Sequence, residues 1–374
     1  MMNGQWMGEF TGSNSGLLVV NIDDMGDHYE GHAVAFDSDS DLPDAFVPLV
    51  TPDKLSVVKI KVPISPIDPR TRAVGSADTI AQHYPKAELF SKWADVTISY
   101  KESDLNLEWE TDAGFVGEAT LPRSKGGELS EYQAINEVTS WDDFKRYVNE
   151  LKPRKYIFRG QRDGRRLRTS FHRAGRADLL RFRSEDIPRL HRHLSNRTRH
   201  LFNLQDADQY GAFYNLVQHH GYPTPLLDWT YSPYVAAFFA FRRVGASHVN
   251  QTIGADKVRI FVFDYQDWKM DVQQSSFLFA VPPHFSVAEF VAIDNERLVP
   301  QQSVSTVTNI DDIESYIRMK ENELRKAYLS VIELPLSARG DVMKELALMG
   351  ITAGALFPGI DGACEELRQL MFFS

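Results

Sequence analysis

The residues of this chain best suited to chemistry are an arginine and a histidine, each followed by a glycine. The apolar run Tyr156–Gln161 is typical of a short buried strand, and it delivers Arg159 at its end. Gly160 has no side chain, so a ligand can approach the backbone closely there. His220, before Gly221 and a Pro-Thr-Pro turn, suits a substrate hydrogen bond or a proton transfer. The structural alternatives are that Arg159 forms an ion pair within the fold and that His220 is a buried histidine whose hydrogen bonds are all made within the protein.

Further polar residues follow within ten positions of His220. A second short strand is expected to end at Asp228 and Trp229. Thr230 or Ser232 is then placed to cap a buried helix, with Pro233 in its first turn. The pattern therefore predicts a strand, a cap and a helix that can also line a pocket.

The sequence predicts no metal site. His219 and His220 are adjacent, so on a strand their side chains point to opposite faces, and no third ligand stands at a recognisable spacing. The single cysteine, Cys364, excludes an intramolecular disulfide and a site made of several thiolates. This cysteine usage fits a reducing cytoplasm.

The length of 374 residues and a change of pattern predict two domains. Residues 1–125 alternate apolar and polar positions between turn residues, which indicates an all-β sandwich or barrel of antiparallel strands. Residues 126–138 read as a linker, and residues 139–374 form the second domain. That domain opens with a helix over Trp141–Leu151 that Ser140 caps.

Four blocks of the second domain, in order, resemble the FRG domain family, named for the run Phe158-Arg159-Gly160. The resemblance covers residues 139–370. It implies a divergent relative of the ADP-ribosyltransferase fold: an α+β, mostly antiparallel split sheet with helical insertions, holding NAD in a cleft. Members of the family are often found in bacterial defence or toxin-like settings. The four blocks are Tyr156–Arg173, Leu216–Ala240, Asn295–Ser303 and Gly350–Gly362.

The resemblance also implies roles for individual residues. Arg159 matches an arginine on the first core strand of such transferases, and its planar fork suits a phosphate or ribose oxygen. Gly160 then offers its backbone to the carboxamide of NAD, Thr230 and Ser232 support the nicotinamide site, and Trp229 forms a stacking wall. We predict the catalytic residues to be Arg159, His220, Asp228 and Gln301, and the residues that contact NAD to be Arg159, Gly160, Gln161, Trp229, Thr230, Ser232 and Gln302.

The sequence departs from the family at the expected catalytic carboxylate. Related transferases place a glutamate on a late strand, where this chain has Gln301. Glutamine carries no charge, so it cannot offset a developing cation as a carboxylate does. The alternatives are that Asp228, Glu289 or Glu296 supplies the charge, or that the domain binds NAD without cleaving it.

Charge is divided unevenly along the chain. Residues 1–50 hold nine acids and no Lys or Arg, so this region repels polyanions. Residues 152–200 hold sixteen Lys or Arg against four acids. This basic segment is expected to contact NAD phosphates or a nucleic-acid target. The alternative is that its arginines pair with the acidic N-terminal domain, which is then a lid or a docking partner.

The function predicted from these observations is an NAD-dependent ADP-ribosyltransferase-like enzyme, or an NAD glycohydrolase, with NAD as substrate. The acceptor is a protein or a nucleic acid, and a partner protein is possible at the N-terminal domain. The alternative is a sensor that binds a nucleotide without turnover. No apolar run of about 20 residues and no secretory signal are found, so we expect a cytoplasmic protein that does not bind membranes.

Overall fold

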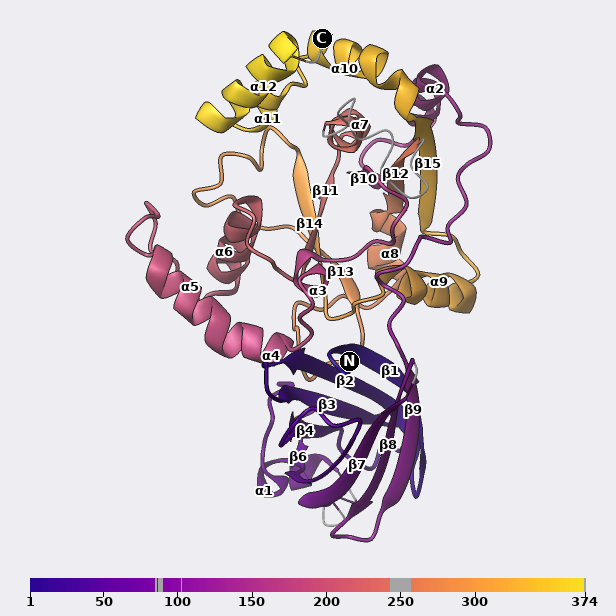
Figure 1. Ribbon diagram of the computed structural model, residues 1–374, viewed down its shortest axis with the longest axis vertical. Coiled ribbons are helices and arrows are strands. Elements are labelled where there is room, and N and C mark those ends of the chain that lie inside the picture. Colours follow the sequence, from indigo (N-terminus) through magenta and orange to yellow (C-terminus); the bar gives the residue numbers. More distant parts are fainter. Residues whose placement is uncertain (85, 87–89, 102, 243–256, 373–374) are drawn as a thin grey trace.

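The structure is a computed structural model that describes residues 1–374 apart from 85, 87–89, 102, 243–256 and 373–374. It contains two β-sheets, one built from the N-terminal third of the chain and the other from the remainder (Figure 1). Within the described part of the chain, no helix combines the length and apolarity needed to cross a membrane.

The N-terminal sheet is antiparallel and curls into a nearly closed barrel (Figure 1). Inward positions alternate with outward ones, as in Ala94, Val96 and Ile98, which are buried. The predicted all-β sandwich or barrel is thus a barrel. In the order β5-β7-β8-β9-β1-β2-β3-β4-β6, its strands are β1 (Gly4–Gly12), β2 (Gly16–Asp24), β3 (Tyr29–Asp37), β4 (Ala45–Val50), β5 (Val57–Pro63), β6 (Ser65–Pro66), β7 (Trp93–Lys101), β8 (Asp104–Thr111) and β9 (Val116–Pro122).

The second sheet has six strands whose pairings are all antiparallel, in the order β13-β14-β11-β10-β12-β15. Its two central strands barely pair: β10 and β11 share the single register position Phe158 with Thr230. Beyond that pair the strands part, which leaves room for side chains between them. The strands are β10 (Tyr156–Gln161), β11 (Leu226–Thr230), β12 (Lys257–Asp264), β13 (Phe285–Ala288), β14 (Ser303–Thr308) and β15 (Leu329–Pro335).

Helices cover both faces of this sheet (Figure 1). One face packs against α2 (Trp141–Glu150), α7 (Pro233–Phe241), α10 (Arg339–Leu348) and α11 (Ala353–Leu356). The other packs against α8 (Tyr265–Asp271) and α9 (Ile313–Leu324). The predicted cap of α2 is confirmed, since Ser140 and Asp143 form a reciprocal capping box. The remaining helices are α1 (Ala77–Ile80), α3 (Ser170–Arg173), α4 (Leu179–Arg181), α5 (Ile187–Leu194), α6 (Ala207–His219) and α12 (Ile360–Phe372).

The segment predicted as a linker runs along the second domain. Ser130 donates its backbone N–H to the carbonyl of Gly164 at 2.8 Å, and Ile135 donates to Val331 at 2.8 Å. The side chain of Glu131 forms an ion pair with Arg166. Residues 126–138 are therefore tied to the second sheet rather than hanging free between the domains.

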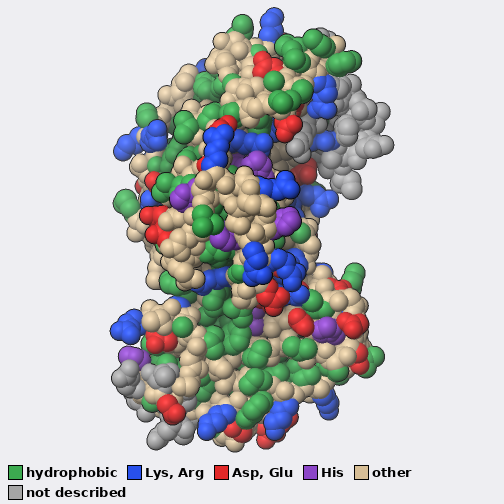
Figure 2. All heavy atoms as spheres, turned by 90° about the vertical axis from the view of Figure 1, so that its left-hand side faces the viewer, with side chains coloured by type: hydrophobic (Ala, Val, Ile, Leu, Met, Phe, Trp, Pro, Cys, Tyr) green, Lys and Arg blue, Asp and Glu red, His purple; other side chains and the backbone are tan. Residues whose placement is uncertain are grey.

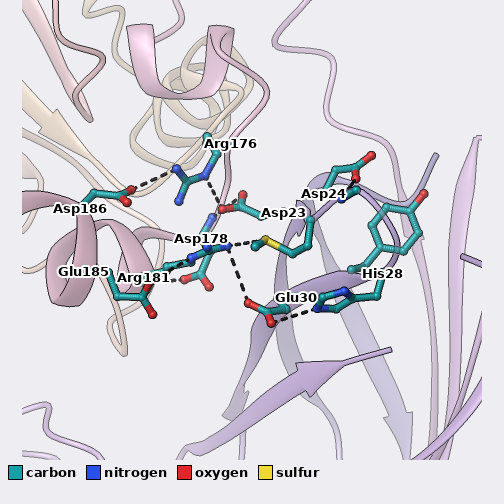
Figure 3. A network of polar contacts seen from close by, with 12 residues as sticks. Asp23, Asp24, His28, Glu30, Arg176, Asp178, Arg181, Glu185 and Asp186 are labelled. Atoms are coloured by element: carbon teal, nitrogen blue, oxygen red, sulfur yellow. Dashed lines mark hydrogen bonds and ion pairs between the residues drawn. The ribbon is translucent and has the colours of Figure 1, made fainter. Parts of the chain in front are cut away.

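A polar cluster joins the barrel to the second domain (Figure 3). The fully buried carboxylate of Asp23, on β2, forms an ion pair with Arg176 and accepts the backbone N–H groups of Ala177 and Asp178 at 2.7 and 3.2 Å. His32 of the barrel lies 3.1 Å from the carboxylate of Asp178. This contact joins the middle of the basic segment 152–200 to the acidic domain, in agreement with the hypothesis that arginines of the segment pair with that domain.

Candidate functional site

A cavity of about 550 Å³ lies beside the parted strands β10 and β11. Its volume is in the range of small-molecule sites. Of the predicted residues, Arg159, Gly160, Asp228, Trp229, Thr230 and Gln301 line it. His219, Gln218, Arg242, Arg297, Asp361 and Glu365 also line it, and we had not predicted these.

Arg159 occupies the gap between the two strands. Its Nη1 donates to the backbone carbonyl of Asp228 at 2.6 Å, so a side chain bridges strands that lack a backbone ladder there. Its buried Nε has no hydrogen-bond partner among the described residues. Burial, helped by the nearby charge of Arg173, lowers the pKa of Arg159 to about 10, while Asp228 opposes this shift. The guanidinium is therefore still charged at neutral pH.

The carboxylate of Asp228 belongs to the same cavity as Arg159. It stands on β11, half-buried, and its Oδ1 accepts a hydrogen bond from Nε2 of Gln218. The Oε1 atom of Gln218 in turn accepts from the hydroxyl of Thr224. The chain of contacts fixes the orientation of the carboxylate in the cavity.

His219, not His220, lines the cavity. The two histidines stand at the end of helix α6, so our assumption that they lie on a strand was wrong. Asn295 donates to Nδ1 of His219 at 2.7 Å, which leaves the proton of the neutral ring on Nε2. That buried Nε2 has no partner among the described residues. Burial lowers the pKa of His219, and Arg297 lowers it further against the pull of Asp228.

His220 caps the C-terminus of α6 and lines a neighbouring groove instead. Arg297 lines both the groove and the cavity. Its Nη1 donates to the backbone carbonyl of His219 at 2.5 Å. It belongs to the block Asn295–Ser303 that carried the resemblance, and this was the signal that could have found it.

Gly160 has a packing role. A Cβ atom at this position would lie 1.8 Å from the backbone oxygen of Ala236 and 2.7 Å from the nitrogen of Ala240. Glycine is required here because α7 crosses β10 at this point. Gly160 also lines the cavity, so its contact with the helix does not decide the role that we expected for it towards a ligand.

The predicted nicotinamide residues make hydrogen bonds within the protein. The hydroxyl of Thr230 donates to the carbonyl of Gln301 at 2.7 Å, and that of Ser232 accepts the N–H of Val235 at 3.2 Å to cap α7. The ring of Trp229 packs against Phe263, with 5.5 Å between centroids, and lies in the core on the other face of β11.

The three glutamines are distributed differently. Gln301 is buried in the cavity wall, and its Nε2 donates to the carbonyl of Leu356 at 2.9 Å. Gln302 is exposed with a φ of 47°, and Gln161 donates to the carbonyl of Arg165 at 2.7 Å. Neither Gln161 nor Gln302 is among the residues that line the cavity.

The alternatives for the catalytic charge are separated by position. Glu289 forms an exposed ion pair with Lys269 at 3.3 Å, and Glu296 lines the neighbouring groove. Asp228 therefore is the alternative that lies in the cavity. Glu365, also in the wall, forms an ion pair with Arg242, which stacks over Phe357 at 3.8 Å. Among the described residues, no group of three or more His, Cys, Asp or Glu side chains is placed to hold a metal ion.

These observations define a class of two-domain protein that has a barrel and a helix-covered antiparallel sheet. A polar cavity lies where the two central strands of that sheet part. Residues 154–248 match the model of the FRG domain family, which confirms the family predicted from Phe158-Arg159-Gly160. The chain thus contains an FRG domain. No curated protein matches the chain.

Two solved structures have similarity to part of the chain. One is a redesigned beta barrel, mFAP1, bound to DFHBI, which is 11% identical with a TM-score of 0.23 and covers 33% of this chain and 94% of its own. The other is the redesigned beta barrel b11L5F_LGL, 11% identical with a TM-score of 0.22, covering 33% of this chain and 91% of its own.

Proposed function

We propose that the FRG domain binds NAD in the cavity beside β10 and β11 and cleaves its nicotinamide–ribose bond, as an ADP-ribosyltransferase-like enzyme. One observation carries the proposal: Arg159 and His219 line the same cavity as Asp228, and each has a buried nitrogen without a partner among the described residues. A buried donor that lacks an acceptor is costly, so such groups are typical of a site completed by a ligand. The pyrophosphate and ribose oxygens of NAD are suitable acceptors.

The cavity also holds the charge that the reaction needs. When the bond from ribose C1′ to nicotinamide breaks, the electron pair leaves with nicotinamide and positive charge develops on the ribose. The carboxylate of Asp228 can stabilise that charge, as carboxylates do in glycoside cleavage. An acceptor hydroxyl or water then bonds to C1′ and passes its proton to Asp228. Arg159 and Arg297 hold the anionic part of the substrate.

Gln301 supports a second function, the binding of NAD without cleavage. This neutral residue stands where the family's resemblance to transferases predicts a glutamate, and its amide is already bonded to Leu356. In this function the same donors recognise the dinucleotide, and the barrel reads out its presence. The measurement below separates the two functions.

The test compares wild type with Asp228→Asn and Glu289→Gln, using calorimetry for NAD binding and free nicotinamide for cleavage. Asp228→Asn keeps the shape of the side chain and removes its charge. We expect Asp228→Asn to retain NAD binding and to cleave NAD at least about 100-fold more slowly than wild type. Glu289→Gln removes a carboxylate outside the cavity and should behave as wild type.

Binding without cleavage by wild type would favour the sensor. No binding of NAD by wild type would contradict the assignment of the cavity. In a defence or toxin-like setting, expression of wild type should arrest growth and Asp228→Asn should relieve the arrest.

A further inference from the structure

The structure divides the basic segment 152–200 into two parts. Five of the eleven basic residues up to Arg181 form ion pairs with described residues. Lys155, Arg166 and Arg168 pair with acids of the second sheet's own domain, and Arg176 and Arg181 reach acids of the barrel. These residues explain why part of the segment is basic: they hold the fold and the junction together.

The second part of the segment has a different environment. Arg189, Arg192, Arg197 and Arg199, on α5 and the turn after it, are exposed. None of the four has a carboxylate within ion-pair distance in the described part of the chain. Figure 2 views the side that carries α5 and α6, and Lys and Arg side chains gather there over the upper domain. Four neighbouring arginines that form no ion pair with a described residue provide a surface suited to an extended anion.

A groove runs beside these arginines. Arg197 and Arg199 line it together with Arg297, which also lines the cavity. Two acids, Asp294 and Glu296, lie in its wall, and Asp294 accepts the backbone N–H of His200 at 2.9 Å. The rest of the wall is largely apolar, and it includes Leu190, Leu194, Leu216, Val217, Tyr222 and Pro223.

The groove adjoins the cavity at three points. Arg297 is common to both, His219 of the cavity precedes His220 of the groove, and Phe357 of the cavity precedes Pro358 of the groove. A chain held in the groove therefore has access to the place where we propose that NAD is cleaved.

We infer that this groove binds a single-stranded nucleic acid, the acceptor of the proposed reaction. The arginines suit a phosphate backbone, which dominates the affinity of such complexes. The apolar wall suits unpaired bases, since proteins that hold single strands pack bases on aromatic and apolar side chains, whereas a duplex keeps its bases inside. The inference rests on the proposed function only for the transfer, and the binding stands by itself.

In the transfer, a nucleophilic atom of the strand bonds to ribose C1′ while the bond from C1′ to nicotinamide breaks. The electron pair leaves with nicotinamide, and the proton of the nucleophile passes to Asp228. No further reactant is needed. RNA and DNA share the required backbone, and the experiment distinguishes them.

The test measures fluorescence anisotropy of labelled 20-residue oligonucleotides with the full chain, without NAD, between 50 and 200 mM salt. Wild type should bind single-stranded RNA or DNA more tightly than the duplex. A variant with Arg189, Arg192, Arg197 and Arg199 all changed to Gln should lose about tenfold or more in affinity. Its slope of log affinity against log salt should fall by about three, because each phosphate contact contributes about 0.7 for single strands.

A matched variant removes four exposed lysines of the barrel, Lys59, Lys61, Lys92 and Lys101, and should bind as wild type. NAD binding by both variants, measured separately, reports on their fold and on the cavity. Equal loss in the two variants, a tighter complex with the duplex, or equal binding of polyglutamate would overturn the inference. Single-strand binding without NAD cleavage would preserve the groove and refute only the proposed reaction.

Discussion

The contact between the two domains should depend on one carboxylate, that of Asp23. It is 1% exposed and receives Arg176 and the backbone N–H groups of Ala177 and Asp178 (Figure 3). The change Asp23→Ala removes all three interactions at once. We expect the barrel to stay folded, because Asp23 is next to the end of β2 and its neighbours keep their pairing with β3.

The size of the effect follows from burial. Removing one partner of a buried ion pair costs about 3–5 kcal/mol. Arg176 is 32% exposed and keeps Asp186 as a partner at 3.0 Å, so solvent and that second carboxylate reduce the loss to the low end. We expect about 3 kcal/mol, which corresponds to roughly a hundredfold change in the equilibrium for opening the junction.

Hydrogen exchange measures this opening directly. The amide protons of Ala177 and Asp178 should exchange about a hundredfold faster in Asp23→Ala. The control is Asp27→Ala, which removes an exposed carboxylate from the turn between β2 and β3. This carboxylate pairs with His28, and its removal should not change the exchange. Exchange of these amides within threefold of wild type in Asp23→Ala would show that Asp23 does not hold the junction.

Other measurements test the packing and the titration of the second domain. Gly160→Ala places a Cβ atom 1.8 Å from the Ala236 oxygen and should lower the free energy of unfolding in urea by about 1–3 kcal/mol or more. The control Gly164→Ala, whose Cβ atom would lie 3.8 Å from the nearest atom, should not lower it. Equal urea midpoints for the two variants would contradict the close crossing of α7 over β10. Burial lowers the pKa of both His172 and His284 from 6.5 to about 4, so the unfolded chain binds protons first as the pH falls. The contribution of the two neutral histidines to the unfolding free energy is fully present above pH 6.5. It should be lost as the pH falls towards 4, by up to about 3 kcal/mol for each histidine. An unfolding free energy that is constant between about pH 7 and 5 would refute this prediction.

Strands with a clear alternation could be predicted from the sequence. The antiparallel β-structure expected over residues 1–125 is present as β1 to β9, and the predicted strand 156–161 coincides with β10. Strand β1 is not evident from the sequence because Gly4, Gly8 and Gly12 alternate with its buried Trp6 and Phe10, and glycine at this spacing resembles turns. A local pattern does not reveal that glycine serves here as a residue within a strand.

The cavity-lining residues that the sequence singled out are those whose positions depend on neighbours along the chain. Arg159 and Asp228 could be singled out because each directly follows apolar residues within a short strand. The sequence pointed to His220, whereas His219 lines the cavity. Which of the two side chains faces the cavity depends on whether the preceding residues form a helix, because successive residues of a helix point in directions about 100° apart. The partners Arg297 and Glu365 come from distant segments, and only the fold brings them together.

The single register pair between β10 and β11 has a consequence for how variants at Arg159 are interpreted. Its side chain does part of what backbone amides do in a regular sheet, because it joins the two strands through the carbonyl of Asp228. The proposed recognition of the substrate and the cohesion of the central strands therefore depend on one guanidinium. Loss of activity in Arg159→Ala would therefore report on both ligand binding and the joining of β10 to β11. Substitutions that extend the pairing of these two strands would close the gap that the proposed ligand needs.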